Sequence, residues 1–263
     1  MNRLTRAFET MASQGRKGLV GYLTAGDPNM AESERRMRDA LDSGVDILEI
    51  GVPFSDPTAD GPVIQAAALR ALNMGATLSK TLDLIARLRQ DCAQPIVLFG
   101  YANPFFRYGY DALARDAAQA GADGLLIVDI PFEERGEIAA ALTKRNLANI
   151  PLVAPTSAPE RVATILETAS GFVYAITVKG VTGRRDDSLP DQAEQIRAIR
   201  ACSALPVAAG FGIGQGTQAA QAAQTADAVV VGSALIEAAQ AGRLADKVRE
   251  LRTALDSLSS RRT

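Results

Sequence analysis

Histidine is absent from all 263 residues of the sequence. This absence excludes a Ser-His-Asp triad, a Cys-His dyad and a histidine general base. It also argues against a catalytic zinc ion, because the protein ligands of such ions commonly include histidine. Any proton transfer that this protein catalyses must therefore depend on Asp, Glu, Lys, Tyr or Cys side chains.

Cysteines and long apolar runs are also scarce. Only Cys92 and Cys202 are present, and their separation fits neither a metal site nor a redox motif. No run approaches the roughly 20 apolar residues that span a bilayer, and residues 1–18 lack the apolar core of a secretory signal. The net charge of −2 shows no bias toward nucleic acid or anionic membranes. We therefore expect a cytoplasmic protein with two inert packing thiols.

Short β-branched runs, punctuated by Gly and Pro, alternate with longer runs rich in Ala, Leu, Arg and Glu. The short runs predict buried strands and the long runs predict amphipathic helices. The predicted strands cover residues 18–25, 45–52, 95–101, 124–130, 151–156, 172–178, 205–209 and 228–231. The predicted helices cover residues 30–44, 77–90, 111–121, 133–146, 159–170, 191–203, 217–226 and 233–240, with an extra helix over 1–14.

Alternating strands and helices predict parallel pairing. Eight such units in about 250 residues fit a closed (β/α)8 TIM barrel, preceded here by one extra helix. A doubly wound open sheet is the alternative, but it usually carries a glycine-rich fingerprint after the first strand. Residues 24–28, TAGDP, lack that spacing. No linker or low-complexity tract divides the chain, so residues 1–263 are predicted to form one barrel domain.

Active sites of such barrels lie at the C-terminal ends of the strands. In the second predicted strand, Glu49 lies between Leu48 and Ile50. Because side chains alternate along a strand, Leu48 and Ile50 should face the helices and Glu49 should point into the barrel. A buried, unpaired carboxyl has a raised pKa, which suits a general acid near neutral pH. The alternative is an ion pair with an inward cation, for which Lys179 is the candidate.

Two further loops carry candidate polar groups. Residues 53–62 contain Asp56 and Asp60, directly after the strand of Glu49; each could equally be a turn former. Residues 179–190 contain two glycines and Thr182 in a polar stretch, which resembles a loop that closes over substrate. A solvated connecting loop is the alternative.

Glycines also follow the last two predicted strands, at residues 210–214 and at Gly232, where Ser233 opens a helix. Glycine lets backbone N–H groups approach an anion closely, and a helix N-terminus adds free donors and a favourable dipole. Phosphate sites between the last two loops are common in TIM barrels. We therefore expect a phosphate-bearing substrate.

These motifs resemble those of the tryptophan synthase α-subunit family along almost the whole chain. The matching segments are YLTAGDP at 22–28, LEIGVPFSDPTADGPVIQ at 48–65, YANP at 101–104, APTS at 154–157, GVTG at 180–183, GFGI at 210–213 and VGSA at 231–234. The long second segment is highly specific, whereas the glycine motifs would also fit other phosphate-binding barrels.

The resemblance implies a retro-aldol cleavage of indole-3-glycerol phosphate to indole and glyceraldehyde 3-phosphate. It implies Glu49 as general acid and base, Asp60 at the indole N–H, and Tyr174 as an active-site tyrosine. Thr182 would close onto Asp60. The remaining implied contacts are Gly183, Gly212, Gly232 and Ser233 for phosphate, and Tyr22, Phe99, Tyr101, Leu126 and Phe211 for indole.

The resemblance also implies a β subunit as partner, in an assembly of two α and two β chains, with indole passing to pyridoxal phosphate held by the β chain. No cofactor is expected in this chain, and the loop with Asp56 and Pro57 would face the partner. Departures from the family include Tyr22 where phenylalanine is frequent and Phe99 where leucine is frequent; both keep an apolar wall. A stand-alone lyase, another phosphate-binding barrel enzyme and a catalytically silent activator of the partner remain alternatives.

Overall fold

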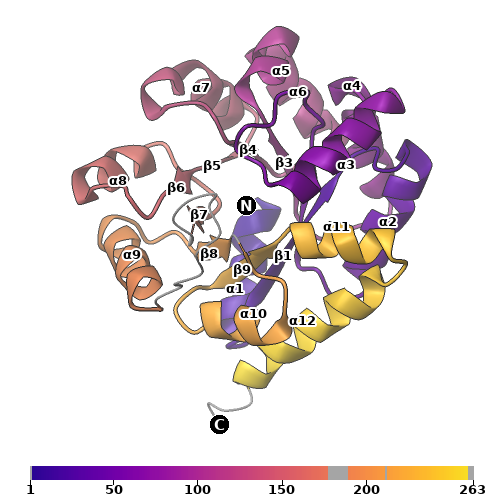
Figure 1. Ribbon diagram of the computed structural model, residues 1–263. Helices are drawn as coiled ribbons and strands as arrows, with labels where there is room; N and C mark the ends of the chain where they lie inside the picture. Colours follow the sequence, from indigo (N-terminus) through magenta and orange to yellow (C-terminus); the bar gives the residue numbers. More distant parts are fainter. Residues whose placement is uncertain (1, 177–188, 211, 260–263) are drawn as a thin grey trace.

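The computed structural model describes residues 2–176, 189–210 and 212–259, and its strands form one parallel sheet. In Figure 1 the strands form the centre of the molecule and the helices surround them. The strand order is β5-β4-β3-β2-β1-β9-β8-β7-β6. The strands are β1 (Gly18–Thr24), β2 (Ile47–Gly51), β3 (Ile96–Gly100), β4 (Gly124–Ile127), β5 (Ala148–Ile150), β6 (Leu152–Val153), β7 (Val173–Ile176), β8 (Val207–Gly210) and β9 (Ala228–Val231).

The predicted TIM barrel is confirmed, with a correction in its fifth strand. That strand begins before the predicted 151–156 and is divided at Pro151 into β5, which pairs with β4, and β6, which pairs with β7. Proline has no N–H to donate to a ladder, so the pairing is interrupted there. The Pro151 carbonyl still accepts a hydrogen bond from Tyr174 N at 3.0 Å. The two halves therefore act as one strand that closes the barrel.

Helices follow the strands as expected, and three of them were not predicted. These three are α3 (Pro62–Asn73), α5 (Ala102–Tyr108) and α12 (Leu244–Ser259). The others are α1 (Arg3–Ser13), α2 (Met30–Asp42), α4 (Leu78–Leu88), α6 (Tyr110–Ala120), α7 (Gly136–Lys144), α8 (Pro159–Leu166), α9 (Leu189–Cys202), α10 (Gly216–Ala222) and α11 (Ser233–Gln240), with a 3₁₀ turn, η1 (Phe132–Glu134). None of the helices in the described ranges is long and apolar enough to cross a membrane.

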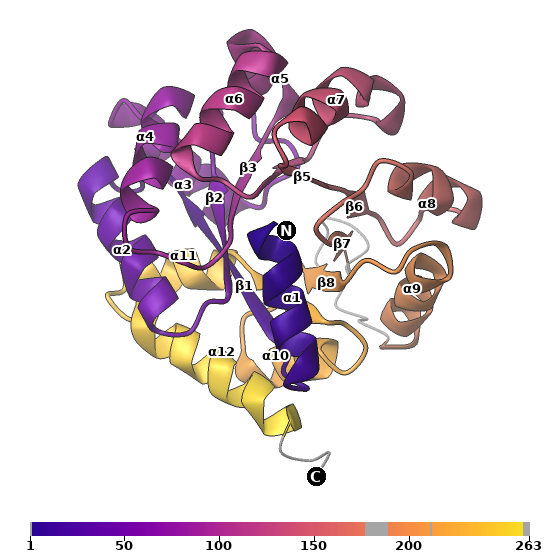
Figure 2. The ribbon, with the colours of Figure 1, turned by 180° about the vertical axis from the view of Figure 1, so that it is seen from behind.

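The extra N-terminal helix α1 closes the barrel at the N-terminal ends of the strands (Figure 2). Asn2 caps it by accepting a hydrogen bond from Leu4 N. Its apolar face, formed by Leu4, Phe8 and Met11, packs in one cluster with the side chains that fill the barrel. The Phe8 and Phe172 rings lie 5.6 Å apart. This end of the barrel is therefore sealed by apolar packing.

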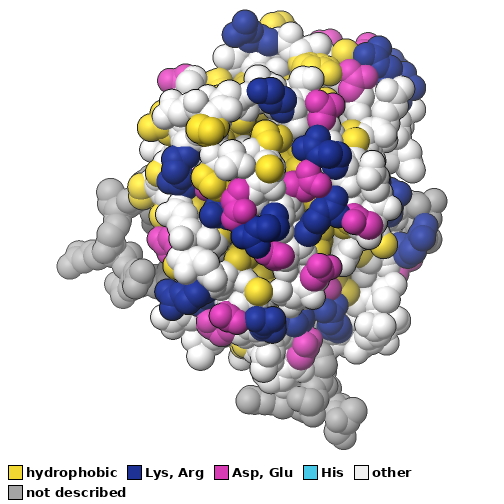
Figure 3. Space-filling model, turned by 90° about the vertical axis from the view of Figure 1, so that its right-hand side faces the viewer, with side chains coloured by type: hydrophobic (Ala, Val, Ile, Leu, Met, Phe, Trp, Pro, Cys, Tyr) yellow, Lys and Arg dark blue, Asp and Glu magenta, His cyan; other side chains and the backbone are white. Residues whose placement is uncertain are grey.

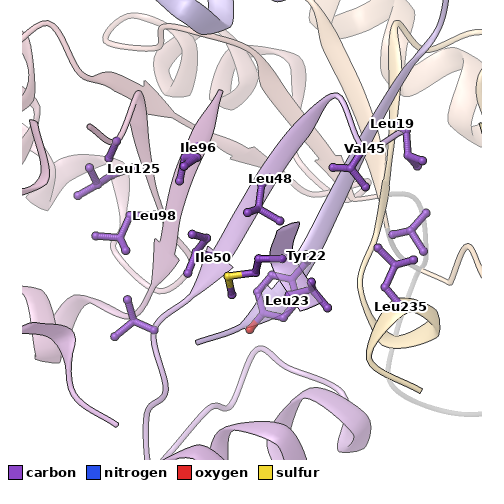
Figure 4. Close-up of a cluster of buried hydrophobic side chains, with 14 of the residues drawn as sticks. Leu19, Tyr22, Leu23, Val45, Leu48, Ile50, Ile96, Leu98, Leu125 and Leu235 are labelled. Atoms are coloured by element: carbon purple, nitrogen blue, oxygen red, sulfur yellow. The ribbon is translucent and has the colours of Figure 1, made fainter. Parts of the chain in front are cut away.

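The core has two layers that follow the alternation of side chains along each strand. Leu48 and Ile50 belong to the outer cluster between strands and helices, as do Leu98 and Leu125 (Figure 4). Ile47, two residues before Glu49, belongs to the inner cluster that fills the barrel. Glu49 shares the inward face with Ile47, so the predicted orientation of Glu49 is confirmed.

The outer helical surface carries interspersed charges of both signs (Figure 3). On α2 and α4, Glu34 pairs with Arg38 at 2.9 Å and with Arg87 at 2.7 Å. Exposed pairs of this kind contribute about 0–1 kcal/mol each. Their small energies make them minor contributors to the packing of α2 against α4.

Candidate active site

A cavity of about 410 Å³ opens at the C-terminal ends of the strands. Its walls come from strands and loops far apart in the sequence, which the barrel brings together. Among the predicted residues, those lining it are Tyr22, Glu49, Asp60, Phe99, Tyr174, Gly212, Gly232 and Ser233. The structure therefore gathers both carboxylates and the glycine-rich loops around a single space.

Glu49 lies at the floor of this cavity and is 1% exposed. Neither of its carboxyl oxygens has a hydrogen-bond partner among the described residues. Burial without a compensating charge raises the pKa of Glu49 to about 8. The carboxyl is therefore mostly protonated at neutral pH, as a general acid must be. The predicted alternative partner, Lys179, lies outside the described residues.

Asp60 faces the same cavity from the loop between β2 and α3. Its carboxyl accepts a hydrogen bond from the Tyr101 hydroxyl at 2.9 Å, and the same hydroxyl accepts one from Ala59 N at 3.1 Å. Burial raises the pKa of Asp60 to about 6, and the Tyr101 hydrogen bond opposes that rise. Asp60 is therefore mostly ionised at neutral pH, whereas Glu49 is mostly protonated. Two carboxyls with separated pKa values can hold different roles in one reaction.

Two tyrosines fill the space over glycines in neighbouring strands. Tyr22 of β1 lies opposite Glu49 in the strand register, and an added Cβ at Gly51 would collide with its hydroxyl. Tyr174 of β7 stands in the same relation to Gly210 of β8. These glycines are required by the close approach of an aromatic ring, and a side chain at either position would displace it.

Tyr22 brings a hydroxyl into this pocket, visible as the red atom in Figure 4. The hydroxyl lies 3.5 Å from Thr24 Oγ1, at the outer limit of a hydrogen bond. Its ring contacts Phe99 edge-on, with centroids 5.0 Å apart. Burial, with a smaller contribution from Asp60, raises the pKa of Tyr22 well above its ordinary value. The Tyr22 hydroxyl is therefore neutral, lies near both carboxylates and accepts this marginal hydrogen bond from Thr24.

The cavity also presents backbone donors. Ser233 and Ala234 open α11, and the first N–H groups of a helix have no partner within it. The N–H groups of Gly212 and Ile213, after β8, likewise have no hydrogen-bond partner in the part of the chain described here. All four residues line the cavity. Free N–H groups at a helix N-terminus form an anion-binding site.

No lysine or arginine lines the cavity among the residues that the structure describes. Three carboxylates do so: Glu49, Asp60 and Glu237. Nor do the described residues form any group of three or more His, Cys, Asp or Glu side chains that could hold a metal ion. Recognition of an anion by these residues therefore depends on backbone N–H groups and the helix dipole.

Several predicted residues lie elsewhere. Leu126 is fully buried among the side chains that fill the barrel and is not among the lining residues of the cavity. Tyr101 contributes through its hydrogen bond to Asp60. Asp56 is exposed and accepts a hydrogen bond from Ser55. Thr182, Gly183 and Phe211 lie outside the described residues.

Sequence reasoning missed several apolar lining residues: Ile64, Val128, Leu152, Ile176, Ile213 and Val230. Strand alternation gave a signal for two of them. Ile176 lies two residues after Tyr174 and so shares its inward face, and Val230 lies near the C-terminal end of the last predicted strand. Glu237 was also missed, since it lies one turn into a helix, on a face that sequence alone did not assign.

Comparison with known proteins agrees with this geometry. The sequence pattern of the family described as tryptophan synthase alpha chain matches residues 8–261. The tryptophan synthase alpha chain of Desulfosudis oleivorans is 45% identical over 262 residues, covering 97% of this chain and 99% of that protein. That of Burkholderia mallei is 45% identical over 264 residues, covering 97% of each.

Solved structures give the same result. A crystal structure of tryptophan synthase from M. tuberculosis in an aminoacrylate-bound form superposes with a TM-score of 0.89 at 38% identity, covering 97% of this chain and 100% of that one. Tryptophan synthase subunit alpha from Legionella pneumophila superposes with a TM-score of 0.90 at 37% identity, covering 98% and 99%. A buried acid and unpartnered backbone donors share one cavity of this barrel, and these relatives lead to one conclusion: the chain belongs to the tryptophan synthase alpha chain family.

Proposed function

We propose that this chain is a lyase that cleaves indole-3-glycerol phosphate to indole and glyceraldehyde 3-phosphate. The observation that carries the proposal is the pair of cavity carboxyls, Glu49 with its pKa near 8 and Asp60 with its pKa near 6. The reaction needs a proton donor at the indole carbon and a negative charge near the ring nitrogen. At neutral pH this pair provides both.

Glu49 donates its proton to the indole carbon that bears the glycerol chain. Positive charge then develops on the ring nitrogen, where the Asp60 carboxylate stabilises it. The carbon–carbon bond breaks as the adjacent hydroxyl loses its proton to the newly formed Glu49 carboxylate. The electrons of the O–H bond form the aldehyde carbonyl of glyceraldehyde 3-phosphate, and those of the broken carbon–carbon bond return to the ring and restore neutral indole. Glu49 is protonated again for the next turnover.

The remaining residues hold the substrate for these steps. Tyr22, Phe99 and Tyr174 form an aromatic wall around the ring, and Tyr101 fixes the Asp60 carboxylate through its hydrogen bond. Tyr174 is the proposed third catalytic residue, because its buried hydroxyl lies beside Gly210 at the mouth of the barrel. The phosphate would bind at the N–H groups of Gly212, Ile213, Ser233 and Ala234.

Indole release from indole-3-glycerol phosphate by the purified chain tests the activity directly. We expect turnover of this substrate and no indole release from the analogue that lacks phosphate. A folded chain that binds the substrate without releasing indole would contradict the lyase assignment and favour a silent activator.

We further propose a tryptophan synthase β subunit as partner, in an assembly of two α and two β chains, located in the cytoplasm. The family supports a β partner. The exposed Phe106 on α5, 67% accessible, and the exposed β2–α3 loop with Asp56 lie at the same end of the barrel as the cavity. Pyridoxal phosphate would be held by the β chain, and this chain would carry no cofactor.

Light scattering of the mixed chains measures the stoichiometry, and indole release with and without β subunit measures activation. We expect a two-to-two complex and faster release. Equal release in both conditions, with no complex formed, would favour a stand-alone lyase.

A further inference from the structure

Residues 212–216, the loop that leads into α10, separate the cavity from a depression on the surface. On its inner side, Gly212, Ile213 and Gly214 line the active-site cavity. On its outer side, Gly212 and Gly214 also line a surface depression of about 440 Å³, whose far wall includes Lys247 and Glu250 of α12. The C-terminal helix therefore reaches the back of the loop that faces the substrate. Figure 1 shows α12 lying along α10 and α11.

Lys247 and Glu250 hold this loop from outside at two points. Lys247 Nζ donates to the Gly214 carbonyl at 3.2 Å, and Glu250 Oε1 accepts from Gly216 N at 2.9 Å. The two side chains also pair with each other, at 2.6 Å between Lys247 Nζ and Glu250 Oε2. One ion pair on α12 therefore fixes the loop at both a carbonyl and an N–H group.

Gln218 holds the same loop from within α10. Its Oε1 accepts hydrogen bonds from Gly214 N at 2.9 Å and from Gln215 N at 3.1 Å. The N–H groups of residues 214–216 are thus all occupied by side chains of the protein. Those of Gly212 and Ile213 have no partner among the described residues, so they remain for a ligand.

The affinity of this site for a phosphate depends on the geometry of this loop. None of the described lining residues is cationic, so what these residues contribute to phosphate affinity comes from backbone N–H groups. A hydrogen bond to a fixed N–H group weakens steeply when its direction changes. The orientation of Gly212 and Ile213 depends on the next residues in the chain, and these are the residues that α12 holds.

We propose that Lys247 and Glu250 are positioning residues for the phosphate group of the substrate, acting through the Gly214 carbonyl and the Gly216 N–H group. The pair carries opposite charges, so its effect comes from loop geometry and not from net attraction of the anion. This inference rests on the proposed function in one respect, that the ligand carries a phosphate.

Calorimetric binding of glycerol 3-phosphate and of indole to the full chain tests the proposal. For Glu250→Ala we expect the Kd of glycerol 3-phosphate to rise about tenfold, because a factor of ten corresponds to about one hydrogen bond and the variant loses the bond to Gly216 N. The Kd of indole should stay within about twofold. In turnover, KM for indole-3-glycerol phosphate should rise while kcat changes little, as expected for lost binding in ground and transition states alike.

Two further variants and a control complete the experiment. Glu250→Gln keeps an acceptor oxygen for Gly216 N and should recover part of the affinity for glycerol 3-phosphate. Lys247→Met should weaken the binding of glycerol 3-phosphate as Glu250→Ala does. The control is Arg249→Ala on the same helix, because Arg249 pairs with Asp246 at the surface and does not touch the loop. It should bind both ligands as the wild type does.

Three results would overturn the proposal. In the first, Glu250→Ala and Lys247→Met bind glycerol 3-phosphate within twofold of the wild type. In the second, these variants bind glycerol 3-phosphate and indole more weakly by the same factor, which would mean that α12 supports only the fold. In the third, Arg249→Ala weakens the binding of glycerol 3-phosphate as much as Glu250→Ala does. If Glu250→Ala does not fold, Glu250→Gln and Lys247→Met decide. A wild type that binds glycerol 3-phosphate but releases no indole would contradict the lyase function alone, leaving this test intact.

Discussion

The two ends of the barrel use carboxylates in opposite ways. At the N-terminal end, Asp46, Asp123 and Asp227 each directly precede a strand, β2, β4 and β9 respectively. Each accepts a hydrogen bond from a backbone N–H of the neighbouring strand, with distances of 2.8 to 2.9 Å. Each is also paired with arginine, through Arg252, Arg89 and Arg200, at 2.9 Å in every case.

At the C-terminal end, Glu49 and Asp60 have no arginine or lysine partner within the described ranges. Glu49 is 1% exposed and Asp123 3%, so burial alone does not separate these two residues. The difference lies in their partners. Asp46, Asp123 and Asp227 accept from N–H donors and pair with arginines, and so they join neighbouring elements. Glu49 has neither kind of partner, and burial keeps it protonated near neutral pH and ready to donate.

The largest effect is expected for the unpaired acid. Replacing Glu49 by Gln keeps the volume but removes the proton donor, so indole release should fall by about 10²–10⁴-fold. Single-turnover assays of the folded variant measure this loss. Near wild-type release would contradict the role of Glu49.

The same variant should gain stability in alkaline solution. The pKa of Glu49 is about 8 in the folded chain, and in the unfolded chain it has its ordinary value of 4.5. Between these values the unfolded chain has lost a proton that the folded chain keeps, so the free energy of unfolding falls by up to about 1.4 kcal/mol per pH unit. Urea unfolding should show Glu49→Gln above the wild type at pH 8, with the gap narrowing toward pH 5.

A substitution at the N-terminal end of the barrel should lower stability and leave turnover almost unchanged. Asp123→Ala removes the carboxylate partner of Arg89, whose side chain is only 13% exposed, and the acceptor for Ile96 N. We expect the free energy of unfolding to fall by about 3 kcal/mol, with little change in turnover per folded molecule. Urea titration combined with active-site titration separates the two quantities. A loss of kcat without a loss of stability would break the comparison.

The pH profile of kcat/KM should report the cavity pair. The reaction needs ionised Asp60, with its pKa near 6, and protonated Glu49, with its pKa near 8. The rate should rise to a plateau between these values and fall about tenfold per pH unit on either side. Asp60→Asn should abolish the acidic limb and keep the alkaline one. A profile that is flat from pH 5 to pH 9 would argue against both assignments.

The smallest effect is expected for Tyr22→Phe. The hydroxyl has only a 3.5 Å contact to Thr24, so its removal should change stability by less than about 1 kcal/mol. Turnover should change no more than a few-fold, because the ring that contacts Phe99 remains. Denaturation and steady-state kinetics measure both quantities. A larger loss of kcat would show that the Tyr22 hydroxyl acts on the reacting groups.

Much of the fold was predictable from the sequence, because strands and helices were recognised by the local spacing of their apolar residues. The runs of β-branched residues located every strand to within a few residues except the fifth, where Pro151 divides the pairing. The helices α3, α5 and α12 were missed, although Pro62 at the first position of α3 is a recognised start signal.

The sequence by itself determined the inward direction of Glu49, because a period of two residues and apolar neighbours leave one face for a carboxyl. It also determined where backbone donors would gather, since glycines followed the last two strands. Only the tertiary structure decided which groups meet: Tyr101 with Asp60, and Lys247 and Glu250 with Gly214 and Gly216. These contacts join residues about 30 to 40 positions apart. They depend on barrel closure and helix packing, which no local pattern encodes.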